Sequence, residues 1–369
     1  MRRREFLLAL SAAAAATLPH ATLSLAADVT APVDGAAGPA SRPATRRSGP
    51  FASFYGMDTG LQGPDVPKPA DKVRLLKELG YDGIGYSFRC VDELRKMLDL
   101  LDAAGVELTA LYTNGPVDDK PVAPTLVKGL QLLKGRRTVV EMTLPGGRSG
   151  RGTSASDEGD AIAAGRLKAV ADAVGTEPGI AGVQVSAYPH VGTYANKVAG
   201  ATRVARLAGG ERIGINLNLY HEGRGDLAKL RPTLKAALPF LKLVTINGHD
   251  GKCSTAPVPD DVYVLGLLRL LKEIGYAGPV GFQGRGIPGP SAELLGQTIK
   301  SWRTMTEALK SAGRPSTGTT AGPRATGRRR SSPRTPRASR RVATSSTSRR
   351  RSSRPMGGRS SLACRASGR

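Results

Sequence analysis

The stretch Arg212–Asp226, RIGINLNLYHEGRGD, begins as a buried strand and ends in a polar turn. Its aliphatic residues alternate with Gly214, Asn216 and Asn218, and the strand pattern stops before His221. Because successive side chains of a β-strand point to opposite faces, Asn216 and Asn218 share one face and the aliphatic side chains share the other. Buried amides cost free energy unless they are hydrogen-bonded. We therefore predict that the asparagine face opens onto a functional site at the C-terminal end of the strand.

Two neighbouring stretches repeat this design. In AGVQVSAYPHVGT (Ala181–Thr193) apolar and polar residues alternate and the run stops at His190, and LKLVTINGHDG (Leu241–Gly251) ends with Asn247 and His249. The chain has four histidines, of which one lies near the N-terminus and the other three follow these consecutive strands. We expect the three imidazoles to converge at one edge of the sheet.

Short apolar runs alternate with amphipathic segments from residue 51 to residue 312. We predict strands at 53–58, 81–88, 106–113 and 138–144, within 181–193, 212–226 and 241–251, and at 279–283. Helices are predicted at 70–79, 91–104, 123–133, 161–174, 195–207, 227–238, 261–274 and 291–309, where apolar residues recur at helical spacing. Strands that alternate with helices form parallel sheets with crossover helices. Eight such units in about 260 residues indicate an α/β fold, a closed (β/α)8 TIM barrel.

An open, doubly wound sheet is the alternative arrangement. It would place a glycine-rich phosphate-binding turn after the first strand, and GMDTG at 56–60 is not a dinucleotide fingerprint. A TIM barrel instead carries its site at the C-terminal ends of the strands. The candidate catalytic residues there are Glu141, His190 and His221. The candidate substrate-binding residues are Tyr188, Asn216, Asn218, Asn247, His249, Gln283 and Arg285.

Three kinds of site remain open for these residues. Imidazoles and a carboxylate around one mouth can bind a divalent metal such as Zn²⁺, Mn²⁺ or Mg²⁺. The candidate ligands are Glu141, His190, His221 and His249. Alternatively, the mouth binds a sugar without metal, because amides offer both donors and an acceptor to a polyol. A structural role for each histidine is the third interpretation.

Several segments of the chain resemble the xylose-isomerase-like barrels of the sugar phosphate isomerase/epimerase family. The most specific is YAGPVGFQGRGI (Tyr276–Ile287), followed by a helix that contains Ser301 and Trp302, and INLNLYH and LVTINGHDG add to it. The resemblance extends from about Phe54 to Met305 and is closest to a subgroup of exported bacterial members. It implies a barrel that acts on a small carbohydrate by proton transfer.

The chain departs from that family at the positions of its usual metal ligands. The resemblance implies a Glu, an Asp, a His and a Glu at the ends of the fifth to eighth strands. The corresponding residues here are Tyr188, Asn218, Asn247 and Gln283. Amides cannot abstract a proton, so an isomerase or epimerase of this kind would use Glu141 or one of the histidines. A carbohydrate-binding or repurposed barrel without isomerase activity is the alternative.

The N-terminal residues have the pattern of a secretory leader. Residues 1–27 place three arginines before a short apolar run, and RREFL at 3–7 is similar to a twin-arginine export signal. The apolar run is too short for a membrane span. Residues 28–50 have the composition of a flexible linker. We therefore expect a periplasmic or otherwise extracytoplasmic protein with no transmembrane helix in its mature form.

The C-terminal residues 313–369 have the composition of a disordered basic tail. From Arg314 onward there are sixteen arginines and no acid, so the tail supplies +16 of the net charge of +24. No aromatic residue is present there to stack on bases, and we expect no specific nucleic-acid partner. Apurinic-site endonucleases share this barrel, but three histidines outside the leader are too few for their zinc cluster. The three cysteines are too scattered for a disulfide framework. The sequence does not indicate an oligomeric state.

Overall fold

The computed structural model describes residues 50–115, 120–146, 156–175, 182–249, 254–257 and 261–311. The expected leader, almost all of the linker and the whole basic tail lie outside the described residues, so these expectations stay predictions. Asp250 and Cys253 also lie outside them.

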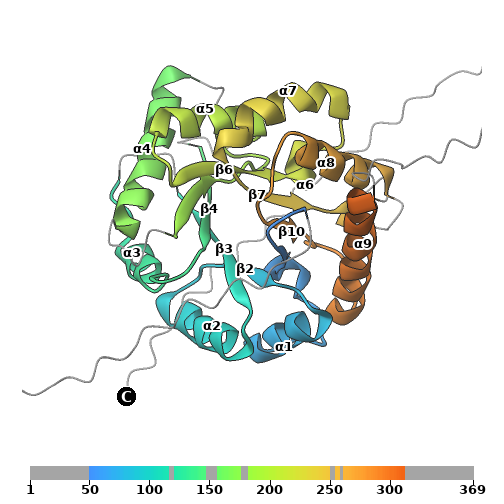
Figure 1. The fold of residues 1–369 in the computed structure, drawn as a ribbon. Helices are drawn as coiled ribbons and strands as arrows, with labels where there is room; N and C mark the ends of the chain where they lie inside the picture. The colour runs from blue at the N-terminus through green and yellow to red at the C-terminus, as the bar shows by residue number, and fades with distance from the viewer. Residues whose placement is uncertain are drawn as a thin grey trace, which may run out of the picture. The chain divides into compact units, whose positions relative to one another are not determined.

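Eight parallel strands close into a barrel, which confirms the predicted fold (Figure 1). The strands are β1 (Phe54–Met57), β2 (Gly83–Ser87), β3 (Glu107–Asn114), β4 (Val139–Thr143), β5 (Gln184–Ala187), β6 (Ile213–Asn218), β7 (Leu241–Ile246) and β10 (Val280–Phe282). Their order around the ring is β1-β10-β7-β6-β5-β4-β3-β2. The first and last strands pair through Tyr55 and Gly281, which closes the sheet.

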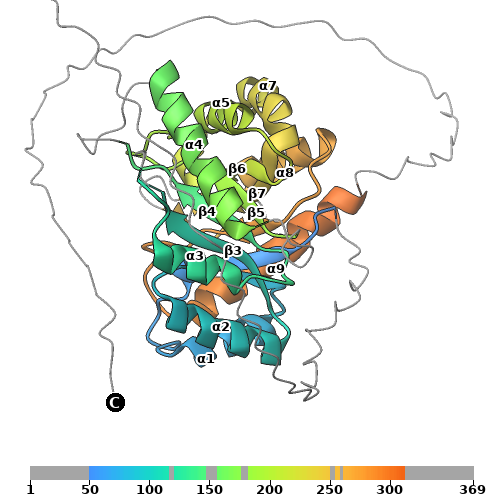
Figure 2. The ribbon, with the colours of Figure 1, turned by 90° about the vertical axis from the view of Figure 1, so that its left-hand side faces the viewer.

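Helices lie outside the ring of strands in both views (Figures 1 and 2). They are α1 (Pro69–Leu79), α2 (Val91–Ala104), α3 (Pro124–Gln131), α4 (Asp157–Val174), α5 (Val198–Ala208), α7 (Leu227–Ala237), α8 (Val262–Glu273) and α9 (Ser291–Ser311). The apolar spacing explains their packing: α2 buries Leu94, Met97, Leu98 and Leu101 on one stripe. Among the helices described, none combines the length and apolarity that a bilayer span needs.

Two short elements modify the rim in ways that the sequence pattern did not predict. A one-turn helix, α6 (Leu219–Glu222), follows β6 directly and contains His221. Two residue pairs, β8 (Gly248–His249) and β9 (Ser254–Thr255), form a small antiparallel sheet after β7. The chain therefore leaves the barrel after Ile246, and His249 belongs to this small sheet.

The lower part of the barrel interior is filled around one aromatic side chain. Tyr55 is fully buried and belongs to a cluster with Met57, Val139 and Leu243. A Cβ atom at Gly281 would lie 2.3 Å from the Tyr55 ring. Glycine at this position therefore gives the ring its space.

Candidate functional site

A chain of three hydrogen-bonded side chains lies inside the barrel, and we call it the interior chain. Ser186 Oγ donates to Asn216 Oδ1 at 2.8 Å, and Asn216 Nδ2 donates to Glu141 Oε1 at 2.5 Å. All three residues are fully buried and come from the adjacent strands β5, β6 and β4. The asparagine face of β6 does point inward as predicted. Asn216, however, is engaged at both ends of its amide.

Burial controls the protonation of Glu141. Desolvation, with a smaller contribution from Asp58, raises the pKa of Glu141 to about 8. Glu141 is therefore a neutral acid at neutral pH. Its Oε2 atom has no hydrogen-bond partner among the described residues, and the same holds for Tyr55 Oη and Thr245 Oγ1. These unpartnered atoms belong to side chains that no solvent reaches.

Two of the three predicted histidines meet at the rim, and we call them the histidine pair. The ring centroids of His190, after β5, and His221, in α6, lie 4.0 Å apart. Tyr188 lies beside both rings, with its centroid 6.2 Å from that of His190 and 5.9 Å from that of His221. Tyr112 from β3 meets the Tyr188 ring edge-on at 5.4 Å. The rim is therefore lined by four rings that meet one another tilted or edge-on.

The two imidazoles differ in their hydrogen-bonding state. His190 Nδ1 lies 2.7 Å from the Val191 carbonyl oxygen, so Nδ1 carries a proton and the Nε2 lone pair of the neutral ring is available. Burial, followed by the charges of His190 and Arg285, lowers the pKa of His221 to about 3. His221 is neutral at physiological pH, and its Nδ1 atom has no partner among the described residues.

The end of β6 holds His221 in place. Asn218 Oδ1 accepts a hydrogen bond from the His221 backbone amide at 3.2 Å, and the Asn218 amide contacts the Tyr188 hydroxyl. Lys197 Nζ donates to the His221 carbonyl oxygen at 2.7 Å. Burial keeps the pKa of Tyr188 well above its usual value, so its hydroxyl stays neutral. Asn218 thus contacts both the Tyr188 hydroxyl and the His221 backbone, and it holds these two residues in place at the end of β6.

The other predicted substrate-binding residues form contacts within the protein or lie apart. Gln283 Oε1 accepts from Thr59 Oγ1 at 2.7 Å and from the Arg285 amide at 3.1 Å. Asn247 Nδ2 donates to the Gly248 carbonyl at 2.6 Å, whereas Asn247 Oδ1 has no partner among the described residues. The Arg285 side chain is exposed.

His249 does not join the histidine pair. It is exposed and lies in the β8–β9 sheet after β7, whereas His190 and His221 follow β5 and β6. The structure brings His190 and His221 together at the rim and places His249 on a separate small sheet. The cause is the departure of the chain from the barrel after Ile246.

Two residues at the mouth were not among the predicted site residues. Asp58, at the end of β1, is buried and accepts hydrogen bonds from Ser87 N at 2.9 Å and Ser87 Oγ at 3.1 Å. Burial raises its pKa although these bonds oppose the shift. Tyr112 shares a face of β3 with Asn114, and burial is the main cause that raises its pKa. Asp58 directly follows β1 and Tyr112 lies near the end of β3, so a polar residue close to a strand end is the signal that could have identified them.

The described residues do not fit a divalent metal. No group of three or more His, Cys, Asp or Glu side chains that could hold an ion occurs in the described part of the chain. Of the four candidate ligands, Glu141 is a neutral acid bound to Asn216 below the rim, and His249 is exposed on another sheet. Only the histidine pair remains together, and two imidazoles do not complete a site of this kind.

Comparison with known proteins supports the fold, and the chemistry of the site is inferred from its residues. No family model matches the sequence, and neither does any curated protein. Solved structures do match over the barrel. An L-ribulose 3-epimerase shares 14% identity with a TM-score of 0.51, over 72% of this chain and 99% of its own.

Two further structures match the same part of the chain. A xylose isomerase-like TIM barrel protein from Mycobacterium smegmatis, in complex with magnesium, shares 17% identity over 70% of this chain and 97% of its own, with a TM-score of 0.52. A sugar phosphate isomerase/epimerase from Parabacteroides distasonis shares 11% identity over 72% and 99%, with a TM-score of 0.50. This chain therefore has the fold of the xylose-isomerase-like TIM barrels, to which sugar isomerases and epimerases belong.

Proposed function

We propose that this protein is a sugar isomerase/epimerase-like enzyme that moves a proton on a carbohydrate with a histidine as the base. The observation that carries the proposal is the histidine pair at the C-terminal rim of the barrel, 4.0 Å between ring centroids. Active sites of TIM barrels lie at this rim. Proton abstraction next to a carbonyl needs a base whose pKa is near the working pH, which imidazole supplies.

His190 is the better base of the two. Its Nε2 lone pair is available because Nδ1 is held by the Val191 carbonyl. His221 has a pKa of about 3 and is too weak a base, but its neutral ring can exchange hydrogen bonds with a sugar hydroxyl. We assign His190 the proton transfer and His221 the orientation of the substrate.

Arg285 supplies positive charge near the rim. Burial is the main cause of the pKa shifts of Tyr112, Tyr188 and His221, and the positive charge of Arg285 is a smaller influence that acts to lower each of these pKa values. Removal of a proton beside a carbonyl places negative charge on the carbonyl oxygen. A cation fixed near that oxygen stabilises the enediolate.

The contact between the two imidazoles favours isomerisation over epimerisation. Rings with centroids 4.0 Å apart leave no room for a substrate carbon between them. The pair therefore serves one face of the substrate, and His190 would take the proton from C2 and return it to C1 on the same face. The hydroxyl proton on the C2 oxygen moves to the C1 oxygen in the enediol, and the two transfers together interconvert an aldose and a ketose. Epimerisation, which delivers the proton to the opposite face, would need a second acid from another strand.

The metal hypothesis receives no support from the residues, and no step is assigned to an ion. Glu141 is likewise placed below the reacting atoms, as a neutral acid that orients Asn216. We therefore interpret the interior chain as the support of the site and the histidine pair as its reactive part.

A carbohydrate-binding barrel without turnover is the second candidate. It is favoured by the neutral side chains of Tyr188, Asn218, Asn247 and Gln283 at the four strand ends. All four already use side-chain atoms in hydrogen bonds within the protein. Binding would then depend on the aromatic rings at the rim, because sugar faces pack on aromatic side chains.

Isotope exchange separates the two candidates. The full-length protein is incubated in D₂O with L-ribulose and with a panel of aldoses, and loss of each carbon-bound proton is followed by NMR. Incorporation of deuterium that is lost in His190→Gln, with sugar binding retained, supports the enzyme. Binding without exchange supports the second candidate, and neither binding nor exchange removes both.

The site of action is a further part of the proposal. The leader-like residues 1–27 and the RREFL segment support export from the cytoplasm in an already folded state. A fusion of these residues to a reporter should reach the periplasm, and Arg3→Lys combined with Arg4→Lys should retain it inside. Equal export of both fusions would contradict a twin-arginine route.

A further inference from the structure

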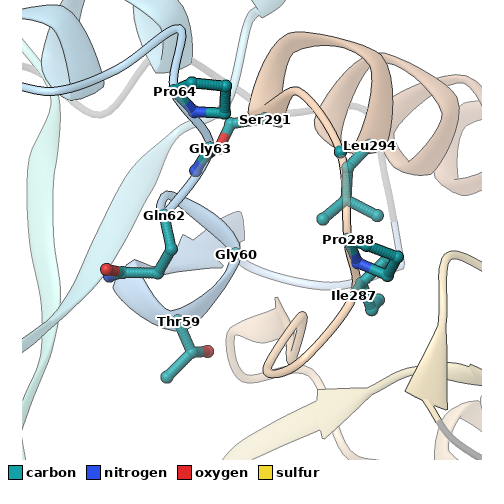
Figure 3. Close-up of a pocket in the computed structure, with 10 residues that line it drawn as sticks. Thr59, Gly60, Gln62, Gly63, Pro64, Ile287, Pro288, Ser291 and Leu294 are labelled. Carbon is teal, nitrogen blue, oxygen red and sulfur yellow. Dashed lines mark hydrogen bonds between the residues drawn. The ribbon is translucent and has the colours of Figure 1, made fainter.

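A cavity of about 180 Å³ lies beside the mouth, between the β1–α1 segment and the β10–α9 segment. Figure 3 shows Thr59 and Gln62 on one side of it and Ile287, Pro288 and Leu294 on the other. It adjoins the mouth directly, because Thr59 Oγ1 donates to Gln283 Oε1 at 2.7 Å at the end of β10. We call this cavity the side cavity.

The side cavity has no ionisable lining. None of its ten lining residues is Asp, Glu, Lys, Arg or His. On one wall Thr59 Oγ1 donates to Gln283 Oε1 and Gln62 Nε2 donates to the Asp58 carbonyl oxygen at 2.6 Å, and the other wall offers aliphatic carbon from Ile287 and Leu294. Such a surface fits an uncharged group, and it gives no counter-charge to an anion.

The helix end next to the side cavity is already occupied by an anion of the chain itself. Asp65 Oδ1 accepts from the Ser291 amide and Oδ2 from the Ala292 amide, each at 2.8 Å, at the N-terminus of α9. Desolvation acts to raise the pKa of Asp65, but these amide bonds outweigh it and lower the pKa. The carboxylate therefore holds its charge where the helix dipole favours a negative group.

A close backbone approach fixes this arrangement. The Gly63 amide donates to Ser291 Oγ at 2.9 Å. A Cβ atom at Gly63 would lie 2.4 Å from Asp65 Oδ1 and 2.5 Å from the Ser291 nitrogen. Only glycine fits here without a shift of the loop, so the loop is built to bring Asp65 onto the helix end.

In TIM barrels the loops after the last strands and the N-terminus of a short extra helix frequently bind a substrate phosphate. Here the helix N-terminus next to the side cavity is that of α9, which follows β10, and Asp65 fills it with a negative charge that repels a second anion. We infer that the side cavity is a subsite for the uncharged end of an unphosphorylated sugar, and that the protein discriminates against sugar phosphates. This inference rests on the proposed function and specifies its substrate class.

The test compares one ketose with its phosphate on the full-length protein. Affinities for L-ribulose and L-ribulose 5-phosphate are measured by calorimetry, with inorganic phosphate as a further probe. We expect the free ketose to bind at least about tenfold more tightly than its phosphate, the ratio that one uncompensated charge typically produces. Equal or tighter binding of the phosphate would overturn the inference and leave the proposed function intact.

Two variants locate the discrimination. Asp65→Ala frees the two amides and removes the charge, so we expect the affinity for L-ribulose 5-phosphate to rise about fivefold or more. Asp71→Ala is the matched control, because Asp71 accepts a hydrogen bond from Lys68 N at the start of α1 and its loss changes charge and capping equally. If the affinity for the phosphate rises equally in both variants, the cause is the change in net charge and not the N-terminus of α9, which contradicts the inference.

Filling the side cavity tests the subsite itself. Ile287 is half-buried at its edge, so Ile287→Trp should fold and should weaken L-ribulose binding about fivefold or more by occupying the space. Ile162→Trp, at an exposed position on α4, is the control and should leave binding unchanged. Unchanged binding in Ile287→Trp with a normal melting curve would remove the subsite. If the wild-type protein binds neither form of the ketose, the proposed function fails and the subsite with it.

Discussion

The interior chain lies within strands β4 to β6 and the histidine pair follows β5 and β6, and the two groups use their polar atoms in opposite ways. In the interior chain, Ser186, Asn216 and Glu141 direct hydrogen bonds at one another and are closed to solvent. In the histidine pair, the His190 and His221 rings meet at an angle of 47° at the rim, His190 Nδ1 contacts the Val191 carbonyl oxygen, and His221 Nδ1 has no partner among the described residues.

The difference between the two groups indicates which side chains of this barrel can exchange a proton with a substrate. Burial makes Glu141 keep its proton and makes His221 lose its own, so both groups are neutral at neutral pH. Only a group at the rim can exchange a proton with a substrate. A carboxylate that looks catalytic in the sequence can therefore be a support, and an imidazole one layer above it can be the reactive group.

The largest expected effect concerns the interior chain. Glu141→Ala leaves the Asn216 amide without its acceptor and opens a cavity, so we expect a loss of about 4 kcal/mol of unfolding free energy. Glu141→Gln keeps the shape and supplies an acceptor to Asn216, and at about pH 5 it should cost less than about 1 kcal/mol. Chemical denaturation measures both. Equal losses would contradict a hydrogen-bonded, neutral Glu141.

The second effect concerns the histidine pair. His190→Gln removes the base but keeps a polar side chain, so we expect deuterium exchange into the sugar to fall about 100-fold or more. Sugar affinity should change by less than about threefold, because the lost interaction belongs to the transition state. His249→Gln is the matched control on the β8–β9 sheet and should exchange normally. An equal loss of deuterium exchange in both variants would contradict a catalytic role of the histidine pair.

The third effect is the pH dependence of stability that Glu141 produces. Its folded pKa of about 8 lies above the ordinary value of 4.5, so its contribution is fully present at low pH and is lost as pH rises. Between about pH 5 and pH 7.5 the wild type should lose roughly 1.4 kcal/mol per pH unit relative to Glu141→Gln. Denaturation midpoints at several pH values give the slope. Parallel curves for the two proteins would show that Glu141 ionises normally.

The smallest effect has the opposite sign and belongs to His221. Its folded pKa of about 3 lies below the ordinary 6.5, so its contribution is present above about pH 6.5 and is lost as pH falls toward 3. Solvent near the rim screens the effect, and we expect less than about 1 kcal/mol per pH unit relative to His221→Gln. Acid denaturation of both proteins checks it. A wild type that gains stability on acidification relative to the variant would contradict a neutral His221.

Much of the fold was predictable because local patterns decided it. The eight buried aliphatic runs and the amphipathic segments between them correspond to eight strands and eight long helices, and the predicted helix 91–104 has the bounds of α2. The inward direction of Asn216 and Asn218 followed from strand alternation. These features depend on neighbours in the sequence, so the sequence alone was sufficient.

The site was only partly predictable because it depends on contacts between distant segments. Consecutive strand ends correctly indicated that His190 and His221 meet. The position of His249 depends on the pairing of Gly248 with Thr255, which no alternation pattern reveals. The neutral state of Glu141 depends on how completely the surrounding barrel buries it, and Asp65 reaches α9 across 226 positions of sequence.

The most direct test of the account is an NMR titration of the carboxyl carbon of Glu141 and the ring carbons of His221, assigned with Glu141→Gln and His221→Gln. We predict that Glu141 remains a carboxylic acid at neutral pH and titrates near pH 8, and that His221 does not take up a proton until the pH falls to about 3. A Glu141 carboxylate at neutral pH, together with a His221 that titrates near its ordinary value of 6.5, would contradict it.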